Sequence, residues 1–197
     1  EADLELVGAV DIKEGTVHLG DGVKVTTDLV AAIEAAKPDV VVDFTRPDVV
    51  MGNLRKMLPL GVHAVVGTTG FSDADLKEVD ELARKHNTSL LIDAPSGTAI
   101  ITAQKIAEVR KAMQQGNPDE KETMAGARGA DYEGMKIHSV RLPGYVASQE
   151  VIFGGQGETL KISTDPINRE CYMPGVALGC RKIVDQVGLV YGLDKLL

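Results

Sequence analysis

The first half of the chain alternates short apolar runs with amphipathic stretches. The apolar runs are rich in Val, Leu and Ile, show no regular alternation with polar residues, and cover residues 4–10, 40–44, 62–66 and 89–92. Such runs are typical of strands that are buried on both faces of a sheet. Stretches of helical length separate them, at residues 29–36, 47–58 and 73–85. Strands separated by helices predict a parallel sheet with right-handed crossovers.

The ends of these predicted helices carry recognisable signals. Asp28 and Ser72 precede two of them, and their side chains can accept hydrogen bonds from first-turn N–H groups. Pro47 suits the first turn of the helix at 47–58, and Gly61 lies just past the end of that helix. Residues 15–25 are broken by glycine and predict a loop or a hairpin.

The pattern changes after residue 92. Residues 98–113 predict one helix, and residues 114–135, rich in Gly, Gln, Lys and Glu, predict a mobile surface loop. Three strands then follow close together in the sequence, at 136–141, 147–153 and 159–164. Short Gly-containing connections between them indicate an antiparallel sheet. A further helix near 172–187 and a short tail complete the chain.

These patterns predict an α/β protein with two domains. The change in composition places the boundary near residues 92–95. We expect a parallel-sheet domain at 1–92 and a smaller α+β domain with a mostly antiparallel sheet at 93–169. The tail near 170–197 is free to pack back on the first domain.

Composition narrows the functional classes. The 197 residues are 44% hydrophobic and 25% charged, which is a usual globular balance. A net charge of −8 argues against nucleic-acid binding, because that needs clustered Lys and Arg. No apolar run approaches the roughly 20 residues of a membrane span. Residues 1–10 have no basic region typical of a signal peptide, and Cys171 and Cys180 fit neither a disulfide framework nor a metal site. We therefore expect a cytoplasmic protein with buried free thiols.

Polar residues follow three of the predicted strands. They are Asp11, Thr45 with Arg46, and Gly67 with Thr68 and Thr69. In an open parallel sheet ligands bind beyond the carboxyl ends of the strands, and an acidic residue after the second strand commonly binds the ribose of a dinucleotide. Each residue also has an ordinary interpretation, as a loop Asp, a solvated Arg, a turn Gly or a capping Thr. The three strand ends together indicate a ligand edge better than any one of them.

A second candidate site is the turn that opens the helix at residue 98. It reads Asp-Ala-Pro-Ser-Gly-Thr-Ala over 93–99. N–H groups at a helix N-terminus attract anions, and the hydroxyls of Ser96 and Thr98 add donors around Gly97, so a carboxylate would fit. The alternative is plain capping of the helix by Ser96 or Thr98.

The phosphate loop expected of a dinucleotide domain does not follow any strand of the chain. Such a loop needs a strand, a Gly-x-x-Gly-x-x-Gly turn and a helix, and it should precede the strand that ends at Asp11. The Gly20–Gly22 turn follows Asp11 and opens no helix, so it is no substitute.

Several motifs resemble one known family. In order along the chain they read ELVGAVD, VVVDFTRPD, GVHAVVGTTGFS, DAPSGTA, IHSVRLPG and FGGQGETLKI. This order resembles the 4-hydroxy-tetrahydrodipicolinate reductase (dihydrodipicolinate reductase) family over nearly the whole chain. The resemblance implies a Rossmann-like cofactor domain and an α+β substrate and tetramerisation domain. It also implies reduction of a cyclic unsaturated dicarboxylate by NADH or NADPH in lysine and diaminopimelate biosynthesis, without a metal.

The resemblance assigns roles to individual residues. It places Asp11 at the ribose, Thr45 and Arg46 near the adenosine end, and Gly67, Thr68 and Thr69 along the cofactor toward the nicotinamide. Arg169 matches an arginine that reaches the cofactor from the second domain. Ser96, Gly97 and Thr98 match the turn that binds a substrate carboxylate, and the strands between 136 and 164 match the sheet that forms a homotetramer.

The chain also departs from the family pattern. The glycine-rich strand–loop–helix unit is absent, and Ile92 meets Asp93 where the family has a few dozen further residues. Those residues end in a Glu-x-His-His-x-x-x-Lys run that supplies the general acid and a catalytic Lys. We therefore assign no catalytic residue in this chain, because none of its histidines stands in that context: His18, His63, His86 and His138.

Two hypotheses account for the departure. The chain is truncated and internally deleted, or it consists of joined parts of a longer polypeptide. We favour joined parts, since the loss of a central strand would expose apolar faces and a bare strand edge. That hypothesis predicts that Ile92 and Asp93 lie much farther apart than the 3.8 Å between neighbouring Cα atoms. It also predicts an empty place in the sheet beside the first strand.

Three other functions stay open. The chain is a non-catalytic module of this family that binds a cofactor or partner, another nicotinamide enzyme of similar fold, or a purely structural oligomer. The DAPSGTA motif, together with the tetramer-type sheet motifs, argues against another nicotinamide enzyme. Cofactor binding would exclude a structural oligomer.

Overall fold

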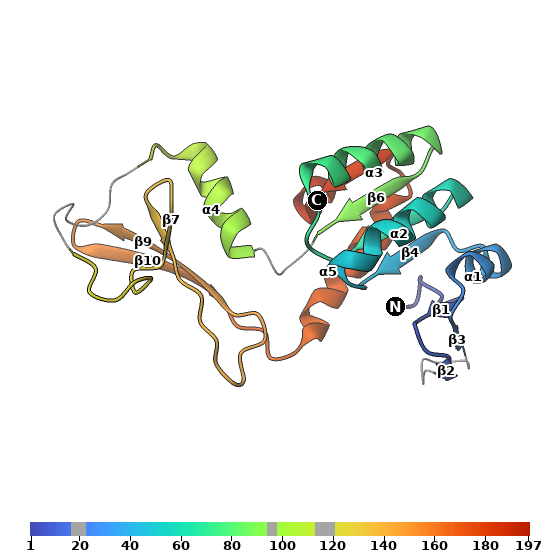
Figure 1. Ribbon diagram of the computed structural model, residues 1–197, viewed down its shortest axis with the longest axis horizontal. Helices are drawn as coiled ribbons and strands as arrows, with labels where there is room; N and C mark the ends of the chain where they lie inside the picture. Colours follow the sequence, from blue (N-terminus) through green and yellow to red (C-terminus); the bar gives the residue numbers. More distant parts are fainter. Residues whose placement is uncertain (17–22, 94–97, 113–120) are drawn as a thin grey trace. The chain divides into compact units, whose positions relative to one another are not determined.

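The computed structural model describes residues 1–16, 23–93, 98–112 and 121–197 (Figure 1). The chain forms two compact units. Unit 1 comprises Glu1–Ala94 together with Tyr172–Leu197, and unit 2 comprises Pro95–Cys171. The chain thus leaves unit 1, builds unit 2 and then returns to unit 1.

Unit 1 is built on a four-stranded parallel sheet, which we call the main sheet. Its order is β11-β6-β5-β4. The strands are β4 (Val40–Asp43), β5 (His63–Val66), β6 (Ser89–Ile92) and β11 (Gly188–Tyr191). The prediction of a parallel sheet from the unbroken apolar runs is confirmed.

The helices predicted at 29–36, 47–58 and 73–85 form within one residue of these bounds, and the helix predicted near 172–187 is shorter. They are α1 (Leu29–Ala36), α2 (Pro47–Met57), α3 (Asp73–Lys85) and α5 (Met173–Ile183), with short 3₁₀ turns at Leu58–Leu60 and Leu193–Leu196. A further 3₁₀ turn at Arg169–Tyr172 crosses from unit 2 into unit 1. The Asp28 carboxylate accepts a hydrogen bond from Ala31 N at 3.1 Å. Ser72 and Asp75 form a reciprocal capping box.

Apolar side chains cover both faces of the main sheet. Ala64, Val66, Leu90 and Ile92 pack in one cluster with buried side chains of α1, α2 and α3. Their neighbours along the strands, represented by Val65 and Leu91, belong to a second cluster with α5 and the C-terminal 3₁₀ turn. Alternate residues therefore serve opposite faces, which explains why the strands show no polar alternation.

The first predicted strand is much shorter than expected. Only Ala9–Val10 forms β1, which pairs in parallel with β3 (Lys24–Thr26) and not with the main sheet. β3 also pairs with β2 (Gly15–Thr16) as an antiparallel hairpin. Residues 4–8 lie opposite no strand among the described residues, so they have no ladder to join.

The C-terminal tail carries a strand that the sequence pattern did not predict. α5 ends at Ile183, and β11 begins at Gly188, whose φ is +89°. Leu189 N donates to the Asp80 carboxylate of α3 at 2.8 Å, and Asp80 also accepts from Arg84 Nε at 2.9 Å. A four-residue strand after a turn glycine resembles a loop when its partner strand is not known.

Replacing Asp80 with alanine is expected to lower the free energy of unfolding by about 1–2 kcal/mol at neutral pH, since a charged acceptor is lost. The hydrogen bond from Arg84, and then that from Leu189, lowers the pKa of Asp80 below its usual 3.8. A lowered pKa gives stability that is present above 3.8 and lost as the pH falls through the lowered value. The free energies of unfolding of the unmodified chain and of Asp80→Ala, measured in urea, should therefore become more alike as the pH is lowered.

Glu81→Ala is the matched control for this prediction. Glu81 lies on the same helix and forms an exposed pair with Lys77 at 3.9 Å, so its loss should change stability by at most about 0.5 kcal/mol. An Asp80→Ala effect that stays constant down to pH 2 would contradict the role of the carboxylate.

Unit 2 contains one described helix and two antiparallel strand pairs. The elements are α4 (Thr98–Val109), β7 (Ala130–Tyr132), β8 (Met135–Ile137), β9 (Gln149–Gly155) and β10 (Glu158–Thr164). β7 pairs with β8, and β9 pairs with β10. The predicted α+β composition of the second half is confirmed.

Several boundaries in unit 2 differ from the prediction. α4 ends at Val109 and not at residue 113, which lies outside the described residues. β7 lies inside the predicted loop, and β8 ends at Ile137 instead of residue 141. The β7–β8 turn uses Glu133 and Gly134, both with positive φ, and a Glu-Gly pair is a weaker hairpin signal than Asn-Gly or Asp-Gly.

The wide separation predicted between Ile92 and Asp93 is wrong. β6 ends at Ile92, which pairs with Val66, and the next amide, Asp93 N, donates to Val66 O at 3.0 Å. The backbone therefore passes directly from the main sheet into Asp93. β4 forms one edge of that sheet, where Val42 is exposed.

Three further points concern the cysteines, the membrane-spanning helices and the metal sites that the sequence analysis considered. Cys171 and Cys180 are free thiols as predicted, but Cys171 is exposed and Cys180 only half-buried. None of the described helices combines the length and apolarity needed to cross a membrane. Within the described ranges, no group of three or more His, Cys, Asp or Glu side chains is arranged to hold a metal ion.

Candidate cofactor site at the carboxyl ends of the main sheet

The loops that follow β4 and β5 lie side by side at the carboxyl edge of the main sheet. We call them the β4 loop (residues 44–46) and the β5 loop (residues 67–70). Parallel pairing of Asp43 with Val66 sets their register, and Gly67 N donates to Asp43 O at 3.0 Å. Two of the three strand ends that the sequence marked as a ligand edge are thus adjacent in space, whereas the third, at Asp11, follows β1 in the separate small sheet.

Asp43, the last residue of β4, organises the β4 loop from inside. Its side chain is only 4% exposed. Oδ1 accepts hydrogen bonds from Thr45 N at 2.8 Å and from the Thr45 hydroxyl at 2.6 Å. Oδ2 accepts from Asn53 Nδ2 of α2 at 2.9 Å. Three donors therefore compensate the desolvation of this carboxylate.

A second hydrogen bond ties the two loops together. The Thr68 hydroxyl donates to Thr45 O at 3.1 Å, and the Thr68 side chain is only 4% exposed. The proton of the Thr45 hydroxyl points to Asp43, because a carboxylate can only accept. Thr45 is exposed but can offer a ligand only its methyl group and the lone pairs of its hydroxyl oxygen.

Phe44 covers the start of the β5 loop. An ideal Cβ built on Gly67 would overlap the Phe44 ring and lie 2.6 Å from its Cδ1. Phe44 is nevertheless 48% exposed. An aromatic side chain that packs on a glycine of the β5 loop therefore stands at the sheet edge, with part of its surface open. Gly70, with φ at +93°, ends the β5 loop against Pro47.

The other residues assigned to the cofactor lie in several places. Arg46 is the N-cap residue before α2 and forms an exposed bidentate pair with Asp48, at 2.9 and 3.0 Å. Thr69 is half-buried in the β5 loop. Asp11 follows β1 in the separate small sheet, where its N–H donates to Thr26 O at 3.0 Å. Arg169 belongs to unit 2, on the 3₁₀ turn at Arg169–Tyr172.

The assigned substrate turn is only partly described. Ser96 and Gly97 lie outside the described residues, and Thr98 is the first residue of α4. α4 is long enough, at 12 residues, for its N-terminal N–H groups to carry partial positive charge.

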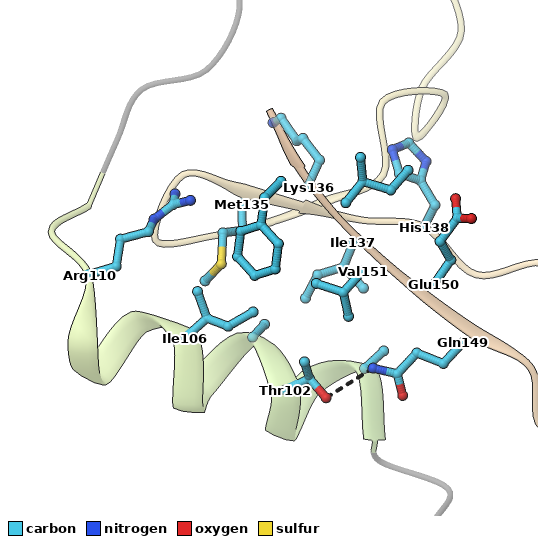
Figure 2. A pocket seen from close by; sticks show the side chains of 14 residues that line it. Thr102, Ile106, Arg110, Met135, Lys136, Ile137, His138, Gln149, Glu150 and Val151 are labelled. Carbon is cyan, nitrogen blue, oxygen red and sulfur yellow. Dashed lines mark hydrogen bonds between the residues drawn. The ribbon is translucent and has the colours of Figure 1, made fainter. Parts of the chain in front are cut away.

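A cavity of about 190 Å³ lies within unit 2 between α4 and strands β8 and β9 (Figure 2). Its walls combine apolar side chains such as Ile106 and Met135 with polar ones, and Gln149 Nε2 donates to Thr102 Oγ1 at 2.9 Å on one side. Arg110 Nη2 is buried there with no hydrogen-bond partner among the residues that the structure describes. All of the residues that line the cavity belong to unit 2.

The carboxyl edge of the main sheet fits a nicotinamide cofactor. The Phe44 ring packs in the space that a Cβ on Gly67 would need, and Phe44 is 48% exposed, so an aromatic surface is open to a ligand at this edge. A flat nicotinamide or adenine ring can pack on such a surface.

Sequence reasoning missed two residues of this site, Asp43 and Phe44. The signal for Asp43 is an acidic residue that ends an otherwise apolar buried strand, since such a carboxylate must find donors. No comparable signal marks Phe44, because the strand pattern simply includes it.

Comparisons with known proteins agree with this architecture. Residues 1–94 match the family model described as dihydrodipicolinate reductase, N-terminus, and residues 71–197 match its C-terminus. The 4-hydroxy-tetrahydrodipicolinate reductase of Shouchella clausii is 42% identical over 241 aligned positions, which cover 100% of this chain and 91% of the relative. The enzyme of the same name from Enterococcus faecalis is 42% identical over 235 positions, with coverage of 100% and 91%.

A solved structure is also similar. It is the dipicolinate-bound dihydrodipicolinate reductase from Paenisporosarcina sp. TG-14, with a TM-score of 0.80 and 35% identity over 100% of this chain and 91% of that chain. The alignment with the Shouchella clausii enzyme is longer than the 197 residues of this chain. That relative therefore carries residues without a counterpart here.

These matches confirm the predicted family, fold class and nicotinamide cofactor. The chain is an oxidoreductase of lysine and diaminopimelate biosynthesis by descent. With two family models spanning its length and curated reductases aligned over all of it, the chain belongs to the dihydrodipicolinate reductase family, the NAD(P)H-dependent 4-hydroxy-tetrahydrodipicolinate reductases.

Proposed function

We propose that the protein reduces a cyclic unsaturated dicarboxylate, with NADH or NADPH held over the β4 and β5 loops. The observation that carries this proposal is the hydrogen-bonded link from Asp43 through Thr45 to Thr68, which fixes two strand-end loops beside each other. The bound cofactor would supply hydride. The residues of this chain bind and orient it, and the family acid–base residues have no assigned equivalent here.

The individual cofactor contacts follow from this placement. The Phe44 ring that packs on Gly67 would contact the cofactor, with Gly67 and Thr69 along it toward the nicotinamide. Thr45 and Arg46 would contact the adenosine end, where the planar guanidinium of Arg46 can pack on a flat ring. Thr68 would act by holding the β4 loop, because its hydroxyl proton is already donated to Thr45 O. Asp11 and Arg169 are proposed contacts by family resemblance.

Cofactor preference is expected to depend on Asp11. Its carboxylate would repel a 2′-phosphate and bind the ribose of NADH, whereas Lys13 can attract that phosphate. We expect use of both cofactors with a preference for NADH, measured as the ratio of kcat/KM values. A strong preference for NADPH would show that Asp11 does not face the ribose.

Thr98→Val is expected to raise KM for the dicarboxylate with little change in NADH affinity. The change keeps the shape of the side chain but removes a hydroxyl donor. One hydrogen bond to a charged group contributes roughly 1.5–3 kcal/mol, or about ten- to a hundredfold in binding. Unchanged dicarboxylate binding in a steady-state titration would mean that Thr98 only caps α4.

A second candidate function is binding without turnover. It is favoured by one observation, the direct passage of β6 into Asp93 where the family has its His-His and Lys run. Such a protein would bind the cofactor and leave it unoxidised.

One experiment separates the two functions. The full chain is titrated with NADH by fluorescence, and NADH oxidation is then followed at 340 nm with the cyclic dicarboxylate present. Saturable binding followed by dicarboxylate-dependent oxidation supports the reductase. Saturable binding without oxidation supports the binding module, and absence of NADH binding contradicts both.

We also propose that the protein is a cytoplasmic homotetramer. Strands β9 and β10 occupy the region that matches the family tetramer sheet. Three large apolar side chains on them are more than half exposed, Ile152, Leu160 and Ile162. Burial of these side chains against other subunits would remove apolar area from water.

A further inference from the structure

We propose that Asp43 is a positioning residue for cofactor binding, which acts by holding Thr45 in the β4 loop. This inference rests on the proposed function, because it assumes that the β4 loop contacts the cofactor. Asp43 itself is 4% exposed and cannot reach a ligand over the edge. Its influence must pass through the groups that it binds.

The carboxylate of Asp43 has two separate tasks. Oδ1 binds the backbone N–H and the hydroxyl of Thr45, two residues away. Oδ2 binds Asn53, which lies in the middle of α2 and outside the cofactor edge. The Oδ1 contacts set the loop, whereas the Oδ2 contact anchors a helix. Variants can remove one task and keep the other.

The Oδ1 contacts fix the whole Thr45 residue. Its N–H and hydroxyl both donate to Asp43, and its carbonyl accepts from Thr68. With all three polar groups engaged, the peptide plane and χ1 of Thr45 each have one arrangement. The Thr45 oxygen and methyl, and Arg46 after it, therefore present a preformed surface. A loop that must first be ordered by the ligand binds it less tightly.

Three variants distinguish this role from general stabilisation. Asp43→Ala removes both tasks. Asp43→Asn keeps one oxygen, which should turn to the two donors of Thr45 and leave its NH₂ against Asn53. Asn53→Ala removes only the anchor on α2. Thr45→Val, which removes the hydroxyl while Asp43 stays intact, serves as a second test if Asp43→Ala does not fold.

Across these variants of the full chain, NADH affinity should fall where the contacts between Asp43 and Thr45 are lost. It should not change in parallel with the thermal midpoint of unfolding. Asp43→Ala and Thr45→Val should raise the Kd for NADH about tenfold or more, the effect of losing one charge-assisted hydrogen bond. Asp43→Asn should recover most of the affinity lost in Asp43→Ala. Asn53→Ala should stay within about twofold of the unmodified chain, although its thermal midpoint falls through loss of a buried hydrogen bond.

Hydrogen exchange of the Thr45 amide gives a readout without cofactor. Exchange should be fast in Asp43→Ala and slow in Asp43→Asn and Asn53→Ala. The inference is overturned if Asp43→Ala keeps a slow Thr45 amide, or if Kd follows the thermal midpoint across all variants. If the unmodified chain fails to bind NADH, the proposed function fails, and the amide pattern still decides whether Asp43 fixes Thr45.

Discussion

Replacing Gly67 with alanine is expected to weaken NADH binding by about tenfold to a hundredfold. The added Cβ would overlap the Phe44 ring, which must then leave its place over the β5 loop. Forcing an extra methyl group into a filled site costs about 1–3 kcal/mol. Because the ring is 48% exposed, it can swing outward. We expect the displaced ring to occupy space that the cofactor needs, so that the cost appears in affinity more than in stability.

Two variants complete this test. Gly52→Ala on α2 is the control, since its Cβ would meet no atom within 4 Å, and it should leave the Kd for NADH unchanged. The double variant Phe44→Ala with Gly67→Ala removes the overlap and should recover part of the affinity. Normal NADH binding by Gly67→Ala alone would show that the cofactor does not approach the β5 loop.

Leu54→Ala is expected to lower the free energy of unfolding by about 2–5 kcal/mol. Leu54 is on α2, has no exposed surface, and packs in the cluster that covers one face of the main sheet. Its truncation removes apolar contacts and leaves a cavity that a rigid sheet cannot fill. Since domains are stable by only about 5–15 kcal/mol in total, the change should be evident as a lower urea midpoint.

Leu60→Ala provides the comparison for Leu54. Leu60 lies one turn beyond the end of α2 and is 38% exposed, so its truncation should cost clearly less. Equal urea midpoints for Leu54→Ala and the unmodified chain would mean that α2 does not pack as described.

Much of unit 1 can be predicted from the sequence because its signals are local. The unbroken apolar runs of β4, β5 and β6 already indicate strands buried on both faces. Asp28 and Ser72 mark helix starts because capping needs only the next few residues. The ligand edge also follows, since carboxyl ends of adjacent parallel strands must meet.

The parts that were not predicted depend on distant partners. β11 forms a strand because it pairs with the edge of β6, and the residues Gly188–Tyr191 alone do not indicate that partner. Residues 4–8 have the composition of a strand but lie opposite no paired strand among the described residues. One partner of the buried Asp43 carboxylate is Asn53, ten positions away on α2. Tertiary context decides each of these cases.

The route of the chain through unit 1 has a consequence for biosynthesis. The main sheet takes β11 from Tyr172–Leu197, a segment that follows all of unit 2. As the ribosome extends the chain, β6 keeps an open edge until residue 191 has emerged, by which time unit 2 has had time to fold. An open parallel edge is a template for pairing with other chains. Translation that stalls between residues 172 and 188 should therefore yield aggregating nascent chains, whereas stalling after residue 191 should not.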